Sequence, residues 1–157
     1  MGSVRILQAI GVPYALEYLA HFGFDTNKHP ANLTLALGTG SVTPVQLASA
    51  YGVFANGGYL VSPWLVQRIS DGRGNVLFES DRTATPAEDA RAIDARNVFV
   101  TDSMLREVTR TGTAASASQR LGRDDLAGKT GTTNDAVDGW FAGYANDIVS
   151  VAWMGYD

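Results

Sequence analysis

The residues whose types and spacing could do chemistry lie together near position 130, where the sequence reads Lys129-Thr130-Gly131-Thr132-Thr133. On a strand, side chains two residues apart share a face, so Thr130 and Thr132 would point the same way. A lysine beside hydroxyl donors can hold a carboxylate, and a glycine lets a ligand approach the backbone closely. An outward N–H at Thr132 could stabilise an oxyanion. We therefore predict catalytic roles for Lys129, Thr130, Gly131 and Thr132, and substrate binding by Lys129, Thr130, Thr132 and Thr133.

The other candidate residues have simpler structural interpretations. Taken alone, even the segment around Lys129 is explained by a strand with one solvated lysine. His21 and His29 lack partners at metal-ligand spacing, so no metal site is predicted. The loop from Gly38 to Ser41 lacks the frame G-x-x-x-x-G-K-[ST] of a phosphate loop and is interpreted as a tight turn. Asp135 and Asp138 could act as acid and base, but a polar loop between strands explains them as well. No cofactor is implied.

Composition narrows the class of protein. The chain has 157 residues, a hydrophobic fraction of 45% and a net charge of −4, from 12 Lys and Arg against 16 Asp and Glu. This is a globular composition, and its negative charge argues against nucleic acid as a partner. The absence of cysteine excludes disulfides and thiolate chemistry. We find no apolar run of about 18 residues and no charged start before an apolar segment, so the sequence predicts neither a membrane anchor nor a signal peptide.

The first eighty residues predict helices followed by a hairpin. Helical periodicity covers residues 3–10 and 13–22, and 24–42 is expected to be a loop. Thr43 and Pro44 are the N-cap and first residue of a helix that lines one face with Leu47, Tyr51 and Phe54 and stops at the glycines 57–58. Residues 59–70 are expected to form an irregular strand, paired with 76–78 across a turn at 71–75.

The second half predicts one long helix and three strands. Residues 81–92 form a connector, Asp94 caps a helix that ends near Arg110, and 113–125 is an exposed loop. The helix would point Val98, Leu105 and Val108 inward. Strands follow at 127–133, 139–145 and 148–156, the last two joined by a tight turn at 146–147. Both faces of this hairpin are apolar, which predicts covering layers on each side. Its aromatic residues are expected in the core: Trp140, Phe141, Tyr144 and Trp153.

Several longer stretches carry a resemblance to a known family. They are Ala36–Pro44, Ala55–Tyr59, Val108–Ala114, Gly128–Asp135 and Asp138–Tyr144. In order and spacing they resemble class A penicillin-binding proteins, in the C-terminal part of the transpeptidase domain. The resemblance implies a mixed α/β (α+β) fold of the β-lactamase/transpeptidase type, with an antiparallel sheet flanked by helices. Residues 3–157 would be an incomplete domain, and residues 1–2 an added start outside it.

The resemblance also implies a reaction, and it indicates which motifs for that reaction this chain lacks. The parent protein would be a serine-type D-Ala-D-Ala transpeptidase that crosslinks peptidoglycan at the periplasmic face of the inner membrane and binds β-lactams. No serine here has a lysine three residues on, and no S-x-N is present. We therefore expect this fragment to be inactive alone and to need the missing N-terminal half. Gly112-Thr113-Ala114 resembles a family loop beside the active-site cleft, where a rim role and a structural role are equally open.

Two alternatives remain at this point. The chain could be a non-catalytic module that pairs with the missing half or self-associates through exposed sheet edges. It could also be a β-lactamase relative, which shares K-T-G. The stretches Gly38–Tyr59 and Thr111–Ala114 favour the transpeptidase class instead.

Overall fold

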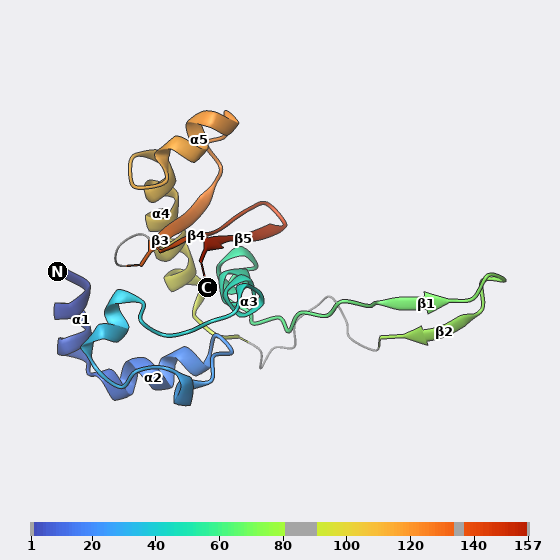
Figure 1. The fold of residues 1–157 in the computed structure, drawn as a ribbon, viewed down its shortest axis with the longest axis horizontal. Coiled ribbons are helices and arrows are strands. Elements are labelled where there is room, and N and C mark those ends of the chain that lie inside the picture. The colour runs from blue at the N-terminus through green and yellow to red at the C-terminus, as the bar shows by residue number, and fades with distance from the viewer. Residues whose placement is uncertain (1, 81–90, 134–136, 157) are drawn as a thin grey trace.

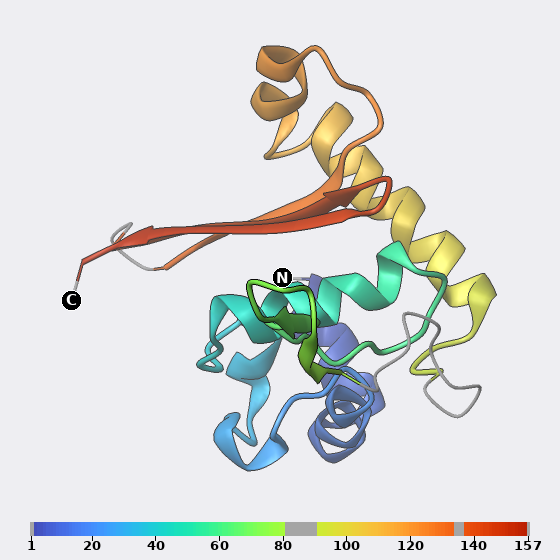
Figure 2. The same cartoon turned by 90° about the vertical axis from the view of Figure 1, so that its right-hand side faces the viewer.

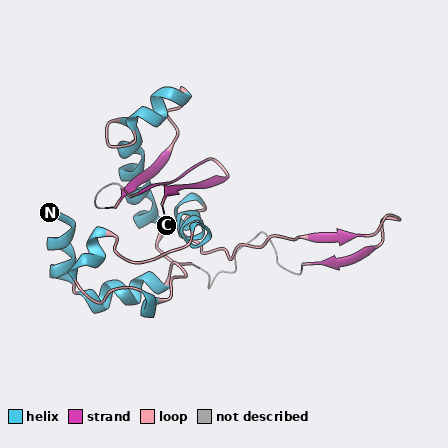
Figure 3. Cartoon of the chain, viewed as in Figure 1, coloured by secondary structure: helices cyan, strands magenta, loops and turns pink. Residues whose placement is uncertain are grey.

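The computed structural model describes residues 2–80, 91–133 and 137–156. Figure 1 labels the elements along the chain and Figure 3 separates helices from strands. The helices are α1 (Gly2–Ile10), α2 (Val12–Ala20), the 3₁₀ turns η1 (Thr26–Lys28) and η2 (Leu33–Leu37), α3 (Pro44–Ala55), α4 (Ala95–Arg110) and α5 (Ala115–Leu121). The strands are β1 (Arg68–Ser70), β2 (Val76–Glu79), β3 (Ala127–Thr132), β4 (Asp138–Ala145) and β5 (Ile148–Gly155).

The main sheet is antiparallel, in the order β3-β4-β5. Its three strands lie where the sequence predicts them, and Asn146 adopts a positive φ of 49° in the tight turn between β4 and β5. Helix α4 packs against β3, while α3 packs against β4 and β5. Figure 2 shows the sheet nearly edge-on, with α3 along one side of it. The mixed architecture of helices flanking an antiparallel sheet is thus as expected.

The two faces of this sheet differ in their cover. The register places Ala127, Lys129, Trp140, Ala142 and Tyr144 on one face, and Tyr144 reaches Asp102 of α4. On the other face, Met154 is 80% exposed and Ile148 is also exposed. The expectation of layers on both faces is therefore wrong for the described part of the chain. Apolar residues on both faces of the hairpin indicated burial on both sides, but within these residues β5 is an edge strand with one packed face.

Helix α3 carries the cap that its sequence predicts. The Thr43 hydroxyl accepts from the Gln46 N–H at 3.2 Å, and the Gln46 side chain accepts from the Thr43 N–H at 2.9 Å. Pro44 occupies the first turn, where no N–H is needed. Leu47, Tyr51 and Phe54, predicted to line one face of the helix, are half-buried, and Ala50 and Val53 are buried.

A hydrophobic core joins α3 to the start of α4. Val53 is 0% exposed and packs with Ala92, Ile93 and Val98, and half-buried side chains surround this cluster: Tyr18, Phe22, Phe54 and Leu60. Asp94 caps α4 as predicted, accepting from the Arg96 N–H at 2.9 Å. Of the three residues expected to point inward on α4, Val98 is buried while Leu105 and Val108 are half-buried.

Three segments differ from the sequence-based expectation. The segment 113–125 contains α5, since its alanines favour a helix that Gly122 ends in a left-handed conformation. The expected loop at 24–42 holds η1 and η2. Within the described residues, the predicted strand at 59–70 shortens to β1 and an isolated bridge at Tyr59, because Pro63 has no N–H to donate to a strand pair. Its turn and hairpin are as predicted, and Figure 1 shows β1 and β2 as an arm that projects from the body.

Of the predicted connector 81–92, only its last two residues lie in the described part of the chain. Arg91 is exposed and bridges to Tyr59, whereas Ala92 is buried in the core, so the expectation of a surface connector is wrong for Ala92. Helix α1 begins at Gly2, one residue before the predicted start. None of the described helices has the length and apolar character needed to cross a membrane.

Gly58 is expected to be essential for the junction between α3 and α4. It has φ of +106°, and a methyl group there would collide with the carbonyl oxygen of Ile93. Its own carbonyl accepts from the Ala92 N–H at 2.8 Å. We expect Gly58→Ala to lower the free energy of unfolding by about 1–3 kcal/mol, measured by urea denaturation. Gly72→Ala is the control because its Cβ would meet open space; equal unfolding midpoints for the two variants would contradict this prediction.

Candidate active site

The outer edge of β3 is open in the described structure. β3 pairs with β4 on one side, and the strand order assigns no described strand to its other side. The Thr133 N–H donates to the Asp138 carbonyl at 3.1 Å, toward β4. Because successive residues of an antiparallel strand direct their backbone groups to opposite edges, the N–H and C=O groups of Thr130 and Thr132 point to the open edge. The Thr132 N–H is therefore presented as the sequence analysis requires.

Lys129 and Thr130 meet at this same edge. The Lys129 ammonium donates to the Thr130 carbonyl at 2.9 Å and lies 3.3 Å from the Thr130 hydroxyl oxygen. The side chain of Lys129 starts on the sheet face shared with Ala142, whereas Thr130 and Thr132 share the opposite face. Since the Thr130 carbonyl points outward, Lys129 reaches around the strand to the open edge. The Lys129 cation, the Thr130 hydroxyl and the outward Thr132 amide thus lie within four consecutive positions of β3.

Gly131 and Thr133 have local structural partners in addition to their predicted roles. A Cβ at Gly131 would lie 3.3 Å from the Cβ of Trp140, so the strand pair itself favours glycine. The Thr133 hydroxyl accepts from the Asp138 N–H at 2.8 Å. Its backbone and side chain therefore close the end of the β3–β4 pair, and its hydroxyl proton is the donor left for a ligand.

Thr113 contributes a further hydroxyl to the site, and it was not among the predicted site residues. Its Oγ1 lies 2.7 Å from the Thr130 Oγ1. The sequence signal was the Gly112-Thr113-Ala114 loop, for which a rim role was one of two open interpretations. The contact with Thr130 brings this loop to the edge of β3.

Helix α4 holds the start of β3 in place through polar contacts. The Thr109 hydroxyl is 1% exposed and lies 2.5 Å from the Leu126 carbonyl oxygen and 2.8 Å from that of Arg106. One turn earlier, the Arg106 guanidinium donates to the Asp125 carbonyl at 3.0 Å. Two residues that directly precede β3 are therefore anchored to one helix. Thr109 was not predicted to be buried, because a lone threonine on a helix gives no sign of a distant carbonyl partner.

Helix α4 is also joined to β4, through the carboxylate of Asp102. Arg106 Nε lies 2.7 Å from Asp102 Oδ2, and the Tyr144 hydroxyl donates to Asp102 Oδ1 at 2.8 Å. Burial, followed by the hydrogen bond to Asp102, raises the pKa of the Tyr144 phenol. The hydrogen bond to Asp102 likewise raises the pKa of Arg106. Tyr144 therefore stays a donor, and Arg106 a cation, at neutral pH.

The weaker candidates remain apart from this edge. His21 packs on Tyr18 and His29 on Phe24. In the described residues no group of three or more His, Asp or Glu side chains is arranged to hold a metal ion. Gly38 ends η2 in a left-handed conformation, which is the structural role expected for its loop. Asp135 lies outside the described residues, so its pairing with Asp138 is not described.

The aromatic residues of the β4–β5 hairpin are buried to different degrees. Tyr144 is 7% exposed and belongs to the core. Trp140 and Trp153 pack at 6.0 Å between ring centroids, and the Trp153 indole donates to Asp138 at 2.9 Å. Trp153 is nevertheless exposed, so the expectation of four core aromatics is wrong for it. Trp140 and Phe141 are half-buried.

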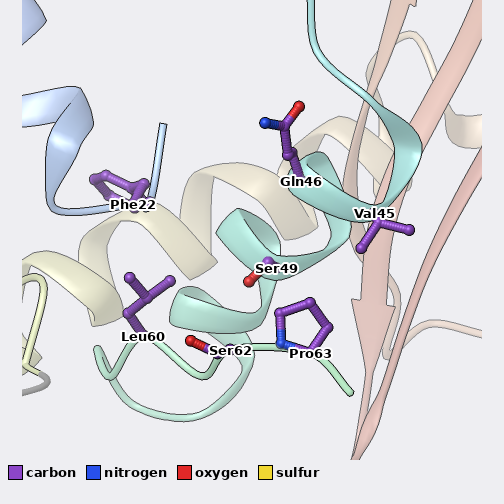
Figure 4. A pocket seen from close by; sticks show the side chains of 8 residues that line it. Phe22, Val45, Gln46, Ser49, Leu60, Ser62 and Pro63 are labelled. Carbon is purple, nitrogen blue, oxygen red and sulfur yellow. The ribbon is translucent and has the colours of Figure 1, made fainter. Parts of the chain in front are cut away.

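A small pocket of about 160 Å³ lies elsewhere, beside α3 (Figure 4). It is lined by Phe22, Gly23, Val45, Gln46, Ser49, Leu60, Ser62 and Pro63. It holds no charged side chain, and its Ser49 hydroxyl already donates to the Val61 carbonyl at 3.0 Å. The predicted site residues are not part of this pocket.

Comparison with known proteins identifies the family of the chain. Residues 1–154 match the family model described as the penicillin-binding protein transpeptidase domain. The chain belongs to this family. It is 45% identical to penicillin-binding protein 1A of Neisseria lactamica over 157 residues, which are all of this chain and 20% of that protein. It is 39% identical to penicillin-binding protein 1A of Pseudomonas aeruginosa, of which it covers 24%. The chain thus spans about a fifth to a quarter of these relatives.

Solved structures agree with this assignment. The crystal structure of penicillin-binding protein 1A from Haemophilus influenzae matches with a TM-score of 0.87 at 30% identity, covering 99% of this chain and 28% of that one. The D,D-transpeptidase domain of a peptidoglycan glycosyltransferase from Eggerthella lenta matches with a TM-score of 0.76 over 99% of this chain and 46% of that one. At 20% identity, the second match supports the fold alone. The resemblance stated from the sequence is confirmed, and the fold is that of transpeptidase domains.

The anchor at Thr109 is expected to stabilise the start of β3. Thr109→Val keeps the shape of the side chain but removes the hydroxyl that donates to the Leu126 carbonyl. We expect the free energy of unfolding in urea to fall by about 1–3 kcal/mol. Thr111→Val is the matched control, since this exposed hydroxyl bonds only within its own helix end, to Glu107. A loss at Thr109 no larger than that at Thr111 would show that the anchor is not stabilising.

Proposed function

We propose that this chain forms one wall of the active site of a serine-type D,D-transpeptidase that crosslinks peptidoglycan stem peptides. The observation that carries the proposal is the open edge of β3, where Lys129, Thr130 and the outward Thr132 N–H lie together. A stem peptide ending in D-Ala-D-Ala presents a carboxylate beside the peptide bond to be broken. Lys129, Thr130 and Thr132 would hold that carboxylate, with Thr133 beside them, and Gly131 would let the peptide approach the strand.

The reaction runs through an acyl-enzyme. A serine Oγ attacks the carbonyl carbon of the D-Ala-D-Ala bond and gives up its proton to a base. The Thr132 N–H stabilises the tetrahedral oxyanion, which collapses as the bond to the terminal D-Ala nitrogen breaks and that nitrogen takes the proton. The amine of a second stem peptide then attacks the acyl carbon and restores the serine hydroxyl. β-Lactams, which carry a carboxylate beside a strained amide, would acylate the same serine.

The nucleophile in this scheme must come from outside these 157 residues. No serine in the chain is followed by lysine at the third position, and no S-x-N is present. The partner of this chain is therefore the serine-bearing half of the transpeptidase domain, which would face the open edge of β3. We propose no activity for the chain alone, and we place the complete protein at the periplasmic face of the inner membrane. No cofactor enters the scheme.

A second candidate is a pairing module without catalysis, and the exposed side of the main sheet favours it. Met154 and Ile148 are solvent-exposed apolar side chains on this side. Such a face, next to an open strand edge, promotes self-association or binding of the missing half. Light scattering and a binding assay separate the candidates. A mass that rises with the concentration of the isolated chain supports self-association. A monomeric chain that regains penicillin binding when its other half is added supports the catalytic proposal.

The catalytic proposal is tested with a completed domain, in which this chain replaces the matching segment of the Neisseria lactamica protein. We expect fluorescent penicillin to label this completed domain covalently on a denaturing gel and to leave the isolated chain unlabelled. Lys129→Ala should slow labelling by about 10- to 100-fold, as expected for the loss of a hydrogen bond to a charged group.

The control is Lys28→Ala, because Lys28 is the other of the two lysines and lies in η1, with its Nζ 3.7 Å from Asp25 Oδ2. It should label at the unsubstituted rate. Label on the isolated chain would overturn its predicted inactivity. A completed domain that folds, as judged by its thermal unfolding, but takes no label would overturn the catalytic role.

A further inference from the structure

The loop between α4 and α5 presents Thr113 in a fixed position. On one side of it, a Cβ at Gly112 would lie 2.9 Å from the Cα and the carbonyl oxygen of Val108, so only glycine fits against the last turn of α4. On the other side, Ala114 is 3% exposed and its N–H donates to the Val108 carbonyl at 3.2 Å. Thr113 itself is exposed. The close approach of Gly112 to the Val108 backbone on one side, and the buried Ala114 on the other, therefore position the exposed hydroxyl of Thr113.

That hydroxyl lies against the Thr130 hydroxyl. The two Oγ1 atoms are 2.7 Å apart, and the Lys129 ammonium lies 3.3 Å from the same Thr130 oxygen. A threonine hydroxyl can accept two hydrogen bonds and donate one, whereas an ammonium can only donate. One acceptor position of Thr130 therefore belongs to Lys129. Thr113 can either take the single proton of Thr130 or fill its second acceptor position.

We propose that Thr113 is a positioning residue that donates to Thr130 when a carboxylate-bearing ligand is bound. With Lys129 and Thr113 both donating to its oxygen, Thr130 has one bond left to make, and that bond is the donation of its proton. The proton then points to the ligand carboxylate rather than to a protein acceptor. The hydroxyl pair thus determines how strongly the site favours ligands with a carboxylate. This inference rests on the proposed transpeptidase function.

The test measures acylation of the completed domain by penicillin and by its methyl ester, in which the carboxylate charge is absent. Thr113→Val, which removes the hydroxyl and keeps the shape, should slow acylation by penicillin about 3- to 10-fold, the range of a neutral hydrogen bond. The rate with the ester should be unchanged. Thr113→Ala should behave like Thr113→Val, and Thr113→Ser should restore the rate. The control Thr111→Val should match the unsubstituted domain.

A double-mutant cycle distinguishes positioning from general support of the fold. If Thr113 acts through Thr130, Thr113→Val combined with Thr130→Val should be no slower than Thr130→Val alone. Independent, multiplied effects would overturn the inference, as would equal slowing with penicillin and its ester, or an unchanged rate in both Thr113→Val and Thr113→Ala. A completed domain in which even the unsubstituted chain takes no label would overturn the proposed function and, with it, this inference.

Discussion

One-sided pairing of β3 is the constraint on which the site depends. A strand that binds a peptide at its edge needs free backbone groups there, yet an unpaired edge is less firmly held and can pair with other chains. The structure resolves this conflict with helix α4. Thr109 and Arg106 bond the carbonyls of Leu126 and Asp125, just before the strand begins, so α4 helps to hold β3 although no described strand pairs with its outer edge. The lysine at the edge also discourages unwanted pairing.

Contacts within the protein hold the donors at this edge. Lys129 contacts the outward carbonyl of Thr130, and Thr113 contacts its hydroxyl. Beneath them, the Tyr144 phenol and the Arg106 guanidinium share the Asp102 carboxylate, which joins α4 to β4. The two sets of contacts have different roles: the first orients groups toward a ligand, and the second keeps the strand and helix that carry them together. Prearranged donors lose less entropy on binding.

Local signals in the sequence predicted the elements whose causes are local. Thr43-Pro44 predicted the start of α3, Asp94 that of α4, and Asn146-Asp147 the turn that pairs β4 with β5. Predictions were wrong where partners far along the chain decide the outcome. The segment 59–70 has strand-forming residues, but within the described part of the chain it pairs only over β1 and at an isolated bridge from Tyr59 to Arg91. Apolar residues on both faces of β5 predicted two covered faces, although cover depends on which helices reach the sheet. In 113–125, polar composition concealed the helix-forming alanines of α5.

By itself, the sequence determined the family and the residue types at the edge, because short spacings place a lysine, two hydroxyls and a glycine on one strand. It also showed that neither S-x-x-K nor S-x-N occurs in these residues. Only the tertiary structure decided which edge of β3 is open, that Lys129 reaches around it, and that Thr113 meets Thr130 across 17 positions of chain. These facts depend on how α4 packs against the sheet, and no local pattern specifies contacts between segments so far apart.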